Sequence, residues 1–540
     1  MRDLLPRPTA VHPAPGEFVF TSATGLSGPD DLTAPIRSAL SVVPLAPNGT
    51  GIEVERDPAL QAEAYTLSVT PERIRITAAD RCGAFYAAQT LRQLLPDAVW
   101  RAAVPAGTRW AVPCGVVEDE PRFSWRGAHL DISRHFMPKR EVLRMIDLLA
   151  MHKMNRLHLH LTDDQGWRVE SHRFPLLHVI GSHRTESMIS HYEEDASYDS
   201  TPHGGYYTLN DLAEIGAYAE ARAITIVPEI DVPGHAAAIL AAYPELGSRH
   251  DTTYQVLGKW GISRAILSPL PATVDFLTEV FAEILAAVKT PYFHLGGDEC
   301  VLDDWEANPE IEEYRRSLGL GSMGELHAHF LRELGDRLAE HGCRAVYWDE
   351  AYVSGRLRDD SLIMAWRGMQ VARRAASAGY DVIATPVVPT YFDYAEVDDA
   401  NEPLAIGGPI TLDDVASFEP APADWPEEAS AHLVGTQFQL WTERIPDGRT
   451  LDYRAWPRGC ALAEVAWSGS ADAEFTGRLT GHLARLDAYG VEYRPLTGPH
   501  PWQSGGTGPR RHRPGRIVAA DVMTRLDGMT LDAASTRPSM

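Results

Sequence analysis

The residues with the clearest chemical potential are two adjacent carboxylates, which follow two glycines in the stretch His294-Leu-Gly-Gly-Asp298-Glu299. Glycines at this point allow the backbone to approach a ligand closely and to present consecutive side chains to one side. Adjacent carboxylates in a dry pocket cannot both ionise freely, so the pKa of one of them is raised. Such a carboxyl group can protonate a glycosidic oxygen as a general acid. The alternative interpretation is a solvated acidic turn without a catalytic role.

This motif belongs to one of eight short apolar segments that alternate with amphipathic helical segments. The predicted strands are 126–133, 156–163, 224–231, 292–299, 344–350, 362–368, 381–386 and 433–441. The helical pattern is clearest at 139–154, 209–223, 273–288 and 323–341. Eight such repeats with nearly continuous apolar strands are typical of a parallel barrel that is buried on both sides. We therefore predict an α/β fold with a (β/α)8 TIM barrel, although 351–361 is too short for a full helix.

A smaller α/β domain is predicted to precede the barrel. The alternating segments 65–69 and 73–77 flank a Pro-Glu turn, which indicates a hairpin in an antiparallel sheet. An apolar helical face at 83–95 ends before Pro96. The predicted divisions are an N-terminal α/β domain at 1–120, a catalytic barrel at 121–498, and a flexible C-terminal tail at 499–540 with a short helix at 517–526.

In a barrel of this type the carboxyl ends of the strands form the active face. Carboxylates, tryptophans and a few other polar groups occupy those ends: Asp131, Arg134, Asp163, Asp164, Asp231, His235, Asp298, Glu299, Trp348, Trp366, Tyr391, Asp393, Trp441 and Glu443. Carboxylates accept hydrogen bonds from sugar hydroxyls, and indoles stack on the apolar faces of a pyranose. This composition favours a glycosidase over an enzyme that acts on phosphates, which would need Gly-rich amide nests and lysines.

Composition excludes several other classes of function. The 540 residues include 49 Lys and Arg against 74 Asp and Glu, a net charge of −25. Such a chain repels phosphate backbones and anionic lipids, so neither nucleic acid nor a membrane is an expected partner. Five separated cysteines without a CxxC pair indicate neither a disulfide framework nor a zinc ribbon. The N-terminus lacks the apolar core of a signal peptide, so we expect a cytoplasmic protein, with export by another route still open. Nothing in the sequence indicates an oligomeric state.

Five motifs between residues 126 and 468 resemble glycoside hydrolase family 20, the β-N-acetylhexosaminidases. They are Arg126-Gly127 with Leu130-Asp131 and Arg134-His135-Phe136, His158-Leu-His-Leu-Thr-Asp163-Asp164-Gln-Gly-Trp167-Arg168, Val227-Pro-Glu-Ile-Asp231-Val-Pro-Gly-His235, His294-Leu-Gly-Gly-Asp298-Glu299, and Ala463-Glu464-Val-Ala-Trp467-Ser468. The N-terminal module also looks like the one that this family carries. The resemblance implies a glycoside hydrolase that needs neither a cofactor nor a metal.

The resemblance further implies retaining hydrolysis without an enzyme nucleophile, one of the exceptions to the two-carboxylate scheme. The 2-acetamido oxygen of the substrate attacks the anomeric carbon and forms an oxazolinium ion, which water then opens. By the resemblance, Glu299 is the general acid and then the base, Asp298 orients the acetamido N–H, and the Tyr391 hydroxyl bonds the acetamido oxygen. The residues themselves agree, because a permanently ionised Asp298 would raise the pKa of Glu299 and meet a cation. The expected activity is the removal of terminal N-acetylglucosamine or N-acetylgalactosamine from small oligosaccharides.

Roles in holding the sugar also follow from the resemblance. Arg134 and Glu443 would bind the hydroxyls at positions three and four, and Asp393 would reach the six-hydroxyl. The walls of the acetamido pocket and the sugar ring would be Trp348, Trp366 and Trp441. Asp163 and His235 resemble the family's pair that tunes the acid from behind. The alternatives are a structural histidine in a Pro-Gly turn for His235 and a surface ion pair for Arg134.

Other readings remain to be tested. A metal-dependent barrel hydrolase is suggested by His158 and His160, which share one face of a strand, but it would need further histidines after the fifth and sixth strands. A sugar-binding protein without activity would be expected to have lost the acid or its partner. Within the family, a disaccharide-releasing enzyme is the alternative. Ile406, where related enzymes often carry a tryptophan that flanks the leaving group, leaves the preference for polymers open.

Overall fold

The computed structural model describes residues 3–47, 49–191, 196–505, 515 and 517–529. At its centre is a closed barrel of eight parallel strands, which confirms the predicted fold class. In chain order the strands are β7 (Trp125–Asp131), β8 (Arg156–His160), β13 (Thr225–Glu229), β14 (Tyr292–His294), β15 (Arg344–Trp348), β16 (Leu362–Ala365), β17 (Asp381–Ala384) and β18 (Leu433–Leu440). The barrel closes where β18 pairs with β7. All eight strands lie within or at the edges of the apolar segments that predicted them.

Alternation along the strands separates two cores. In β8, Leu157 and Leu159 pack in the large apolar cluster outside the barrel. Because side chains alternate along a strand, His158 and His160 point into the interior of the barrel. The interior contains an apolar cluster that consists of Trp125, Val227, Val346, Trp348, Leu362, Met364 and Ile383. Beside this cluster lie buried histidines and a buried glutamate, Glu229. The barrel is thus a packed core that combines apolar and polar side chains.

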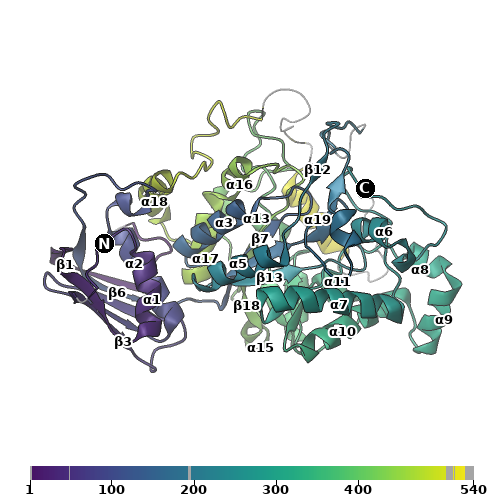
Figure 1. Ribbon diagram of the computed structural model, residues 1–540, viewed down its shortest axis with the longest axis horizontal. Helices are drawn as coiled ribbons and strands as arrows, with labels where there is room; N and C mark the ends of the chain where they lie inside the picture. The colour runs from purple at the N-terminus through teal and green to yellow at the C-terminus, as the bar shows by residue number, and fades with distance from the viewer. Residues whose placement is uncertain (1–2, 48, 192–195, 506–514, 516, 530–540) are drawn as a thin grey trace.

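Helices surround the barrel, as Figure 1 shows for α3, α5, α7 and α10. Their bounds are α3 (Lys139–Met151), α5 (Leu209–Glu220), α7 (Pro271–Val288) and α10 (Met323–Glu340), which match the four predicted helices within three residues at either end. The connection after β15 contains only the short α11 (Asp349–Ser354), in agreement with the short segment expected there. The later connections use α12 (Met369–Ser377), α13 (Val387–Thr390), α14 (Leu412–Ala416), α15 (Glu427–Ala431), α16 (Gly448–Ala455), α17 (Arg458–Ser468) and α18 (Phe475–Tyr489).

Long connections at the carboxyl ends of β8, β13 and β14 carry small elements of their own. These are β9 (Thr162–Asp163), β10 (Gly166–Trp167), α4 (Leu176–Val179), β11 (His183–Arg184), β12 (His203–Gly204), α6 (Ala237–Ala242), η2 (Pro244–Leu246), α8 (Asp303–Ala307) and α9 (Pro309–Ser317). None of the helices among the described residues combines the length and the apolar character that a membrane span requires.

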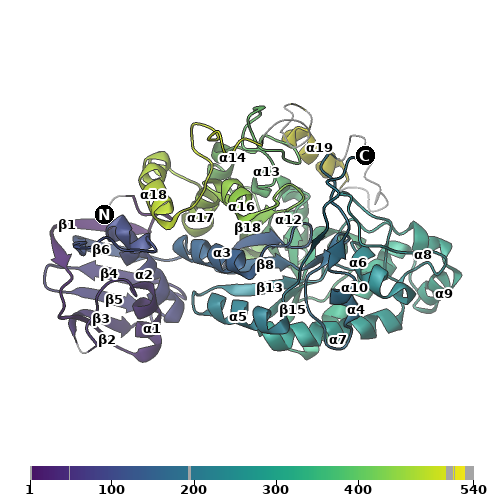
Figure 2. The same ribbon diagram turned by 45° about the horizontal axis from the view of Figure 1, so that its top comes forward.

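A six-stranded sheet precedes the barrel, with the strand order β1-β6-β4-β5-β3-β2. Its elements are β1 (Ala10–Val19), β2 (Thr24–Ser27), α1 (Asp30–Ala39), β3 (Thr50–Arg56), β4 (Tyr65–Val69), β5 (Ile74–Ala78), α2 (Arg81–Leu94), η1 (Asp97–Trp100) and β6 (Ala111–Asp119). The four strands β1, β6, β4 and β5 pair antiparallel and include the predicted hairpin, whereas β3 and β2 extend the sheet in parallel. Both larger helices lie between this sheet and the barrel (Figure 2).

A C-terminal helix, α19 (Ala519–Met529), packs against α13 (Figure 1). The N–H of Gly408 donates a hydrogen bond of 3.0 Å to the carbonyl oxygen of Ile517, and the side chain of Ile517 is buried. This helix falls close to the one expected at 517–526. The remainder of the segment expected to be a flexible tail lies partly outside the described residues, at 506–514, 516 and 530–540.

Candidate active site

Asp298 and Glu299 follow β14 directly, and the two glycines between them and the strand make a close backbone approach possible. Gly296 and Gly297 have φ values of +67° and +93°, in a region that favours glycine. A Cβ atom on Gly296 would lie 1.7 Å from Oδ1 of Asp231, and the N–H of Gly297 donates a hydrogen bond of 3.2 Å to that oxygen. The turn therefore requires glycine, as the sequence predicted, and it brings Asp231 close behind the two carboxylates.

The two neighbouring carboxylates differ in burial. The side chain of Asp298 is 12% exposed, and that of Glu299 is 31% exposed. Burial raises the pKa of Asp298 to about 6; the positive charge of His235 opposes this shift, and the negative charge of Glu299 adds to it. Burial thus outweighs the charge of His235, whose Nε2 atom lies 3.8 Å from Oδ2 of Asp298, and the permanent ionisation of Asp298 stays a prediction.

His235 lies between Asp163 on one side and the pair Asp298 and Glu299 on the other. Its Nε2 atom is 3.5 Å from Oε2 of Glu299 and 3.8 Å from Oδ2 of Asp298. On the other side of the ring, Nδ1 is 3.2 Å from Oδ1 of Asp163. Burial alone would lower the pKa of this histidine, but the charges of Asp163 and Asp231 outweigh it and hold the pKa well above its usual value. The structure thus brings together the pair that the sequence suggested.

Arg134 is held in place by other residues of the predicted site and by Gln165. Its Nη2 atom is 2.7 Å from Oδ2 of Asp163, and its Nε–H donates a hydrogen bond of 3.0 Å to Oε1 of Gln165. The guanidinium carbon lies 4.9 Å from the centre of the Trp441 ring, within the range of a cation–π contact. Because Arg134 is 7% exposed, it is not the surface ion pair of the alternative interpretation.

Aromatic side chains line the same end of the barrel. The ring centroids of Trp348 and Trp441 are 6.0 Å apart, and Tyr391 lies 6.4 Å from Trp366 and 6.5 Å from Trp441. Trp348 is fully buried, whereas Trp366 and Trp441 are partly exposed. The indole N–H of Trp366 donates a hydrogen bond of 2.9 Å to Glu350. The three predicted tryptophans and the predicted tyrosine therefore form one continuous wall.

Five buried carboxylate oxygens at this end have no hydrogen-bond partner among the residues that the structure describes. They are Oδ2 of Asp164, Oδ2 of Asp231, Oδ1 of Asp298, Oδ1 of Asp393 and Oε2 of Glu443. Burial raises the pKa of Asp393 and of Glu443 above the usual values, which reflects the cost of keeping these groups ionised without partners. Buried polar atoms are nearly always paired in native proteins, so unpaired acceptors around an aromatic wall indicate a site for a ligand rich in donors. Ile406 lies in the connection between β17 and β18, which also contains Asp393, and its carbonyl oxygen faces Nε2 of His191 at 3.1 Å.

Glu229, the buried residue in which β13 ends, is not among the residues that the sequence predicted for the site. Its Oε2 atom lies 2.5 Å from Nδ1 of His160 and 3.0 Å from Nε2 of His158. The two histidines that suggested a metal site therefore face one carboxylate. A signal was available, because Asp231 was placed on the active face and Glu229 precedes it by two residues in an extended segment.

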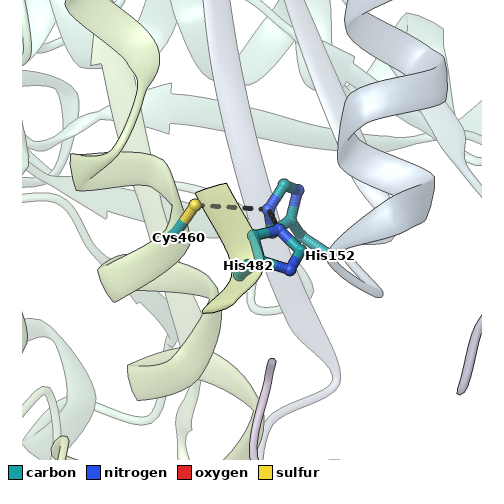
Figure 3. A group of neighbouring side chains, drawn as sticks. All are labelled: His152, Cys460 and His482. Atoms are coloured by element: carbon teal, nitrogen blue, oxygen red, sulfur yellow. Dashed lines mark hydrogen bonds between the residues drawn. The ribbon is translucent and has the colours of Figure 1, made fainter. Parts of the chain in front are cut away.

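A second group of possible metal ligands lies at the opposite end of the barrel (Figure 3). Nε2 of His152 is 3.0 Å from Nε2 of His482 and 3.3 Å from Sγ of Cys460. Nδ1 of His152 faces the carbonyl oxygen of Leu148 at 2.7 Å, so it carries the proton and Nε2 accepts. Arg485 donates to Nδ1 of His482 at 3.3 Å, which leaves the Nε2–H of that ring to donate to His152. Hydrogen bonds thus account for both rings.

Comparison with known proteins agrees with this architecture. The family model for the catalytic domain of glycosyl hydrolase family 20 matches residues 123–470, and the model for domain 2 of the same family matches residues 1–120. The chain is 36% identical over 468 residues to a β-hexosaminidase of Porphyromonas gingivalis, a match that covers 85% of this chain and 58% of that protein. It is 33% identical over 514 residues to a β-N-acetylhexosaminidase of Cellulomonas fimi, covering 91% of this chain and 95% of the relative.

A crystal structure of the family 20 exo-β-N-acetylglucosaminidase from Vibrio harveyi, in complex with N-acetylglucosamine, has a TM-score of 0.79 to this fold. The two sequences are 33% identical, and the match covers 92% of this chain and 78% of the other. With both domains matched in order and the strand-end carboxylates gathered around one aromatic wall, the chain belongs to glycosyl hydrolase family 20.

Proposed function

We propose that this protein is a retaining exo-β-N-acetylhexosaminidase that removes terminal β-linked N-acetylglucosamine or N-acetylgalactosamine from oligosaccharides. The observation that carries the proposal is the set of unpaired buried acceptors, Asp298, Asp393 and Glu443, beside partly exposed indoles. A sugar supplies hydroxyl and amide donors for such acceptors and an apolar face for the rings. The names of the relatives support the same class of substrate.

The first step uses the acetamido group of the substrate as the nucleophile. Its carbonyl oxygen forms a bond to the anomeric carbon while the bond from that carbon to the leaving oxygen breaks. Glu299 donates a proton to the leaving oxygen, and an oxazolinium ion remains on the sugar. Glu299 is assigned this role because it is the more exposed of the two carboxylates, and Nε2 of His235 lies 3.5 Å from its Oε2 atom.

Asp298 and Tyr391 hold the acetamido group in this scheme. Ionised Asp298 accepts a hydrogen bond from the acetamido N–H and stabilises the positive charge that develops there. Tyr391 keeps its proton, since burial raises the pKa of its hydroxyl well above the usual value, and it can donate to the acetamido oxygen. In the second step water attacks the anomeric carbon, the Glu299 carboxylate takes its proton, and the ring of the intermediate opens with retained configuration.

The remaining polar groups fix the sugar in the pocket. Arg134 and Glu443 are proposed to bind the hydroxyls at positions three and four, and Asp393 the six-hydroxyl, because each carries donors or unpaired acceptors at the buried end. Walls for the acetamido group and the ring are Trp348, Trp366 and Trp441. Removal of terminal residues is proposed because the relatives include an exo-β-N-acetylglucosaminidase.

The deciding experiment compares two 4-nitrophenyl β-glycosides that differ only at position two, one with an acetamido group and one with a hydroxyl. The proposal predicts that kcat/KM is larger for the acetamido substrate by at least about 10³-fold, because effective molarities of well-oriented internal nucleophiles are very large. The same pair in the galactose series tests the N-acetylgalactosamine part. Equal rates on the acetamido and hydroxyl substrates would overturn the proposal.

A further inference from the structure

Glu229 is a fully buried carboxylate inside the barrel, below the proposed sugar pocket. Four nitrogen atoms surround its two oxygens. Nδ1 of His160 and Nε2 of His158 lie 2.5 and 3.0 Å from Oε2, and Nδ1 of His294 lies 2.9 Å from Oε1. The indole N–H of Trp348 donates a hydrogen bond of 3.0 Å to Oε1. These neighbours come from β8, β14 and β15, so one carboxylate ties three other strands together beneath the site.

His160 carries a positive charge on geometric grounds. Its Nδ1 atom faces Glu229 at 2.5 Å, and its Nε2 atom faces Oδ2 of Asp163 at 2.7 Å. Because both partners are carboxylate oxygens, each ring nitrogen must supply a proton. Burial would lower the pKa of this histidine, but the charge of Glu229 and the hydrogen bonds to both carboxylates outweigh it, and the pKa lies well above the usual value.

Asp163 connects His160 to His235, the residue that lies beside the proposed general acid Glu299. It accepts hydrogen bonds from His160 and from Nδ1 of His235 at 3.2 Å, and it contacts Arg134 at 2.7 Å. Nε2 of His235 in turn lies 3.5 Å from Glu299. Burial acts to raise the pKa of Asp163, but the charges of Arg134 and His235 outweigh it and keep the carboxylate ionised. Buried charges of alternating sign therefore run from the barrel interior to the reacting centre.

We propose that Glu229 and His160 are positioning residues that hold Asp163 and His235 in register with the general acid Glu299; this inference rests on the proposed function. A buried ion whose partner is removed must move toward another partner or lose its charge. Without the Glu229 charge, the pKa of His160 falls and the ring tends to lose one proton, so the hydrogen bond that orients Asp163 loses its charged donor. His235 and then Glu299 would shift from the positions in which they meet the leaving oxygen.

The test is the isosteric substitution Glu229→Gln in the full chain, assayed with an acetamido 4-nitrophenyl glycoside and with the corresponding disaccharide. A displaced acid matters most for the poor leaving group. We expect kcat to fall about 10²-fold on the disaccharide and much less on the nitrophenyl glycoside, with KM for both nearly unchanged. A merely structural role would lower the folded fraction and reduce both rates equally. An equal loss on both substrates, or no loss, would overturn the inference.

The matched control is Glu464→Gln, another fully buried carboxylate, which pairs with Arg478 and the N–H of Arg7 away from the site. It should leave the ratio of the two rates unchanged, and a shift as large as that of Glu229→Gln would contradict a specific role. If Glu229→Gln does not fold, His160→Gln takes its place. The same larger loss of kcat on the disaccharide than on the nitrophenyl glycoside is expected, and an equal loss on both, or no loss, would overturn the inference.

The proposed function and this inference can fail separately. If the wild type prefers glycosides with a 2-hydroxyl, the proposed function fails, and the disaccharide and the nitrophenyl glycoside are then compared with 2-hydroxyl substrates. A wild type that cleaves neither series overturns both.

Discussion

Buried carboxylates at the two ends of the barrel differ in their partners. At the carboxyl ends of the strands, Asp298, Asp393 and Glu443 each keep a buried oxygen that no described residue bonds. At the opposite end, both oxygens of Asp119 are satisfied. Oδ2 accepts from Lys153 at 2.6 Å and from the Tyr65 hydroxyl at 2.7 Å, and Oδ1 accepts from the indole of Trp467 and the N–H of Thr9.

The difference separates function from stability within one fold. Paired charges at the amino ends join the N-terminal domain to the barrel, because Tyr65 lies in β4 and Lys153 follows α3. Unpaired acceptors at the carboxyl ends cost stability and are explained by a ligand that completes them. Barrels of this type place reactive groups at the carboxyl ends and structural contacts at the other end.

Removal of the proposed acid should give the largest effect on activity. We expect Glu299→Gln to lower kcat on oligosaccharides by about 10²–10⁴-fold, the contribution of general acid catalysis. Substrates with good leaving groups should lose less, and the melting temperature should not fall, since the side chain is partly exposed. Steady-state kinetics on the two substrate types with parallel thermal unfolding would check this. An equal loss on both would contradict the acid role.

At the amino ends of the barrel strands, removal of a buried carboxylate should lower stability and leave activity unchanged. Asp119→Asn leaves the buried Lys153 without its charged partner, and breaking such a pair costs about 3–5 kcal/mol. The free energy of unfolding should fall, while kcat measured well below the unfolding transition stays at the wild-type value. Glu17→Gln, which removes the exposed partner of Arg109, is the control and should leave the melting temperature unchanged. A large loss of kcat in folded Asp119→Asn would remove the distinction between the two ends.

A smaller effect is expected on the pH dependence. Asp298 must be ionised to meet the acetamido N–H, and burial raises its pKa to about 6 in the free site. Because protonation inactivates this group, kcat/KM should fall as the pH drops through about 6. The acid limb of kcat should lie at lower pH, since the bound acetamido group favours the ionised form. A flat kcat/KM between pH 7 and 5 would contradict this account of Asp298.

The fold and the strand-end residues could be predicted because they depend on local patterns. Apolar segments such as 156–163 and 224–231 each mark one strand, and closure of eight of them into a barrel brings their ends together. The Gly-Gly turn before Asp298 was predictable for the same reason, since it is encoded within six consecutive residues. The roles of these residues in the reaction remain predictions that the experiments above test.

The partners of buried groups could not be predicted, because they come from distant parts of the chain. Glu229 meets nitrogen atoms of three other strands, and Asp119 meets Lys153 across a domain junction. The protonation of Asp298 also depends on burial that only the folded site sets. Helical periodicity at 517–526 indicated the C-terminal helix but gave no sign that it packs against α13.

The most direct test of substrate-assisted catalysis is the binding of a thiazoline analogue of the cyclised intermediate, measured by calorimetry on the wild type and on Asp298→Asn. A site that matches the oxazolinium ion should bind the analogue with micromolar or tighter affinity, because analogues of reactive intermediates bind about 10²-fold or more tightly than substrates. Asp298→Asn should weaken that binding, since its amide cannot replace the carboxylate. A wild type that shows no binding at millimolar analogue would contradict a nucleophile supplied by the sugar.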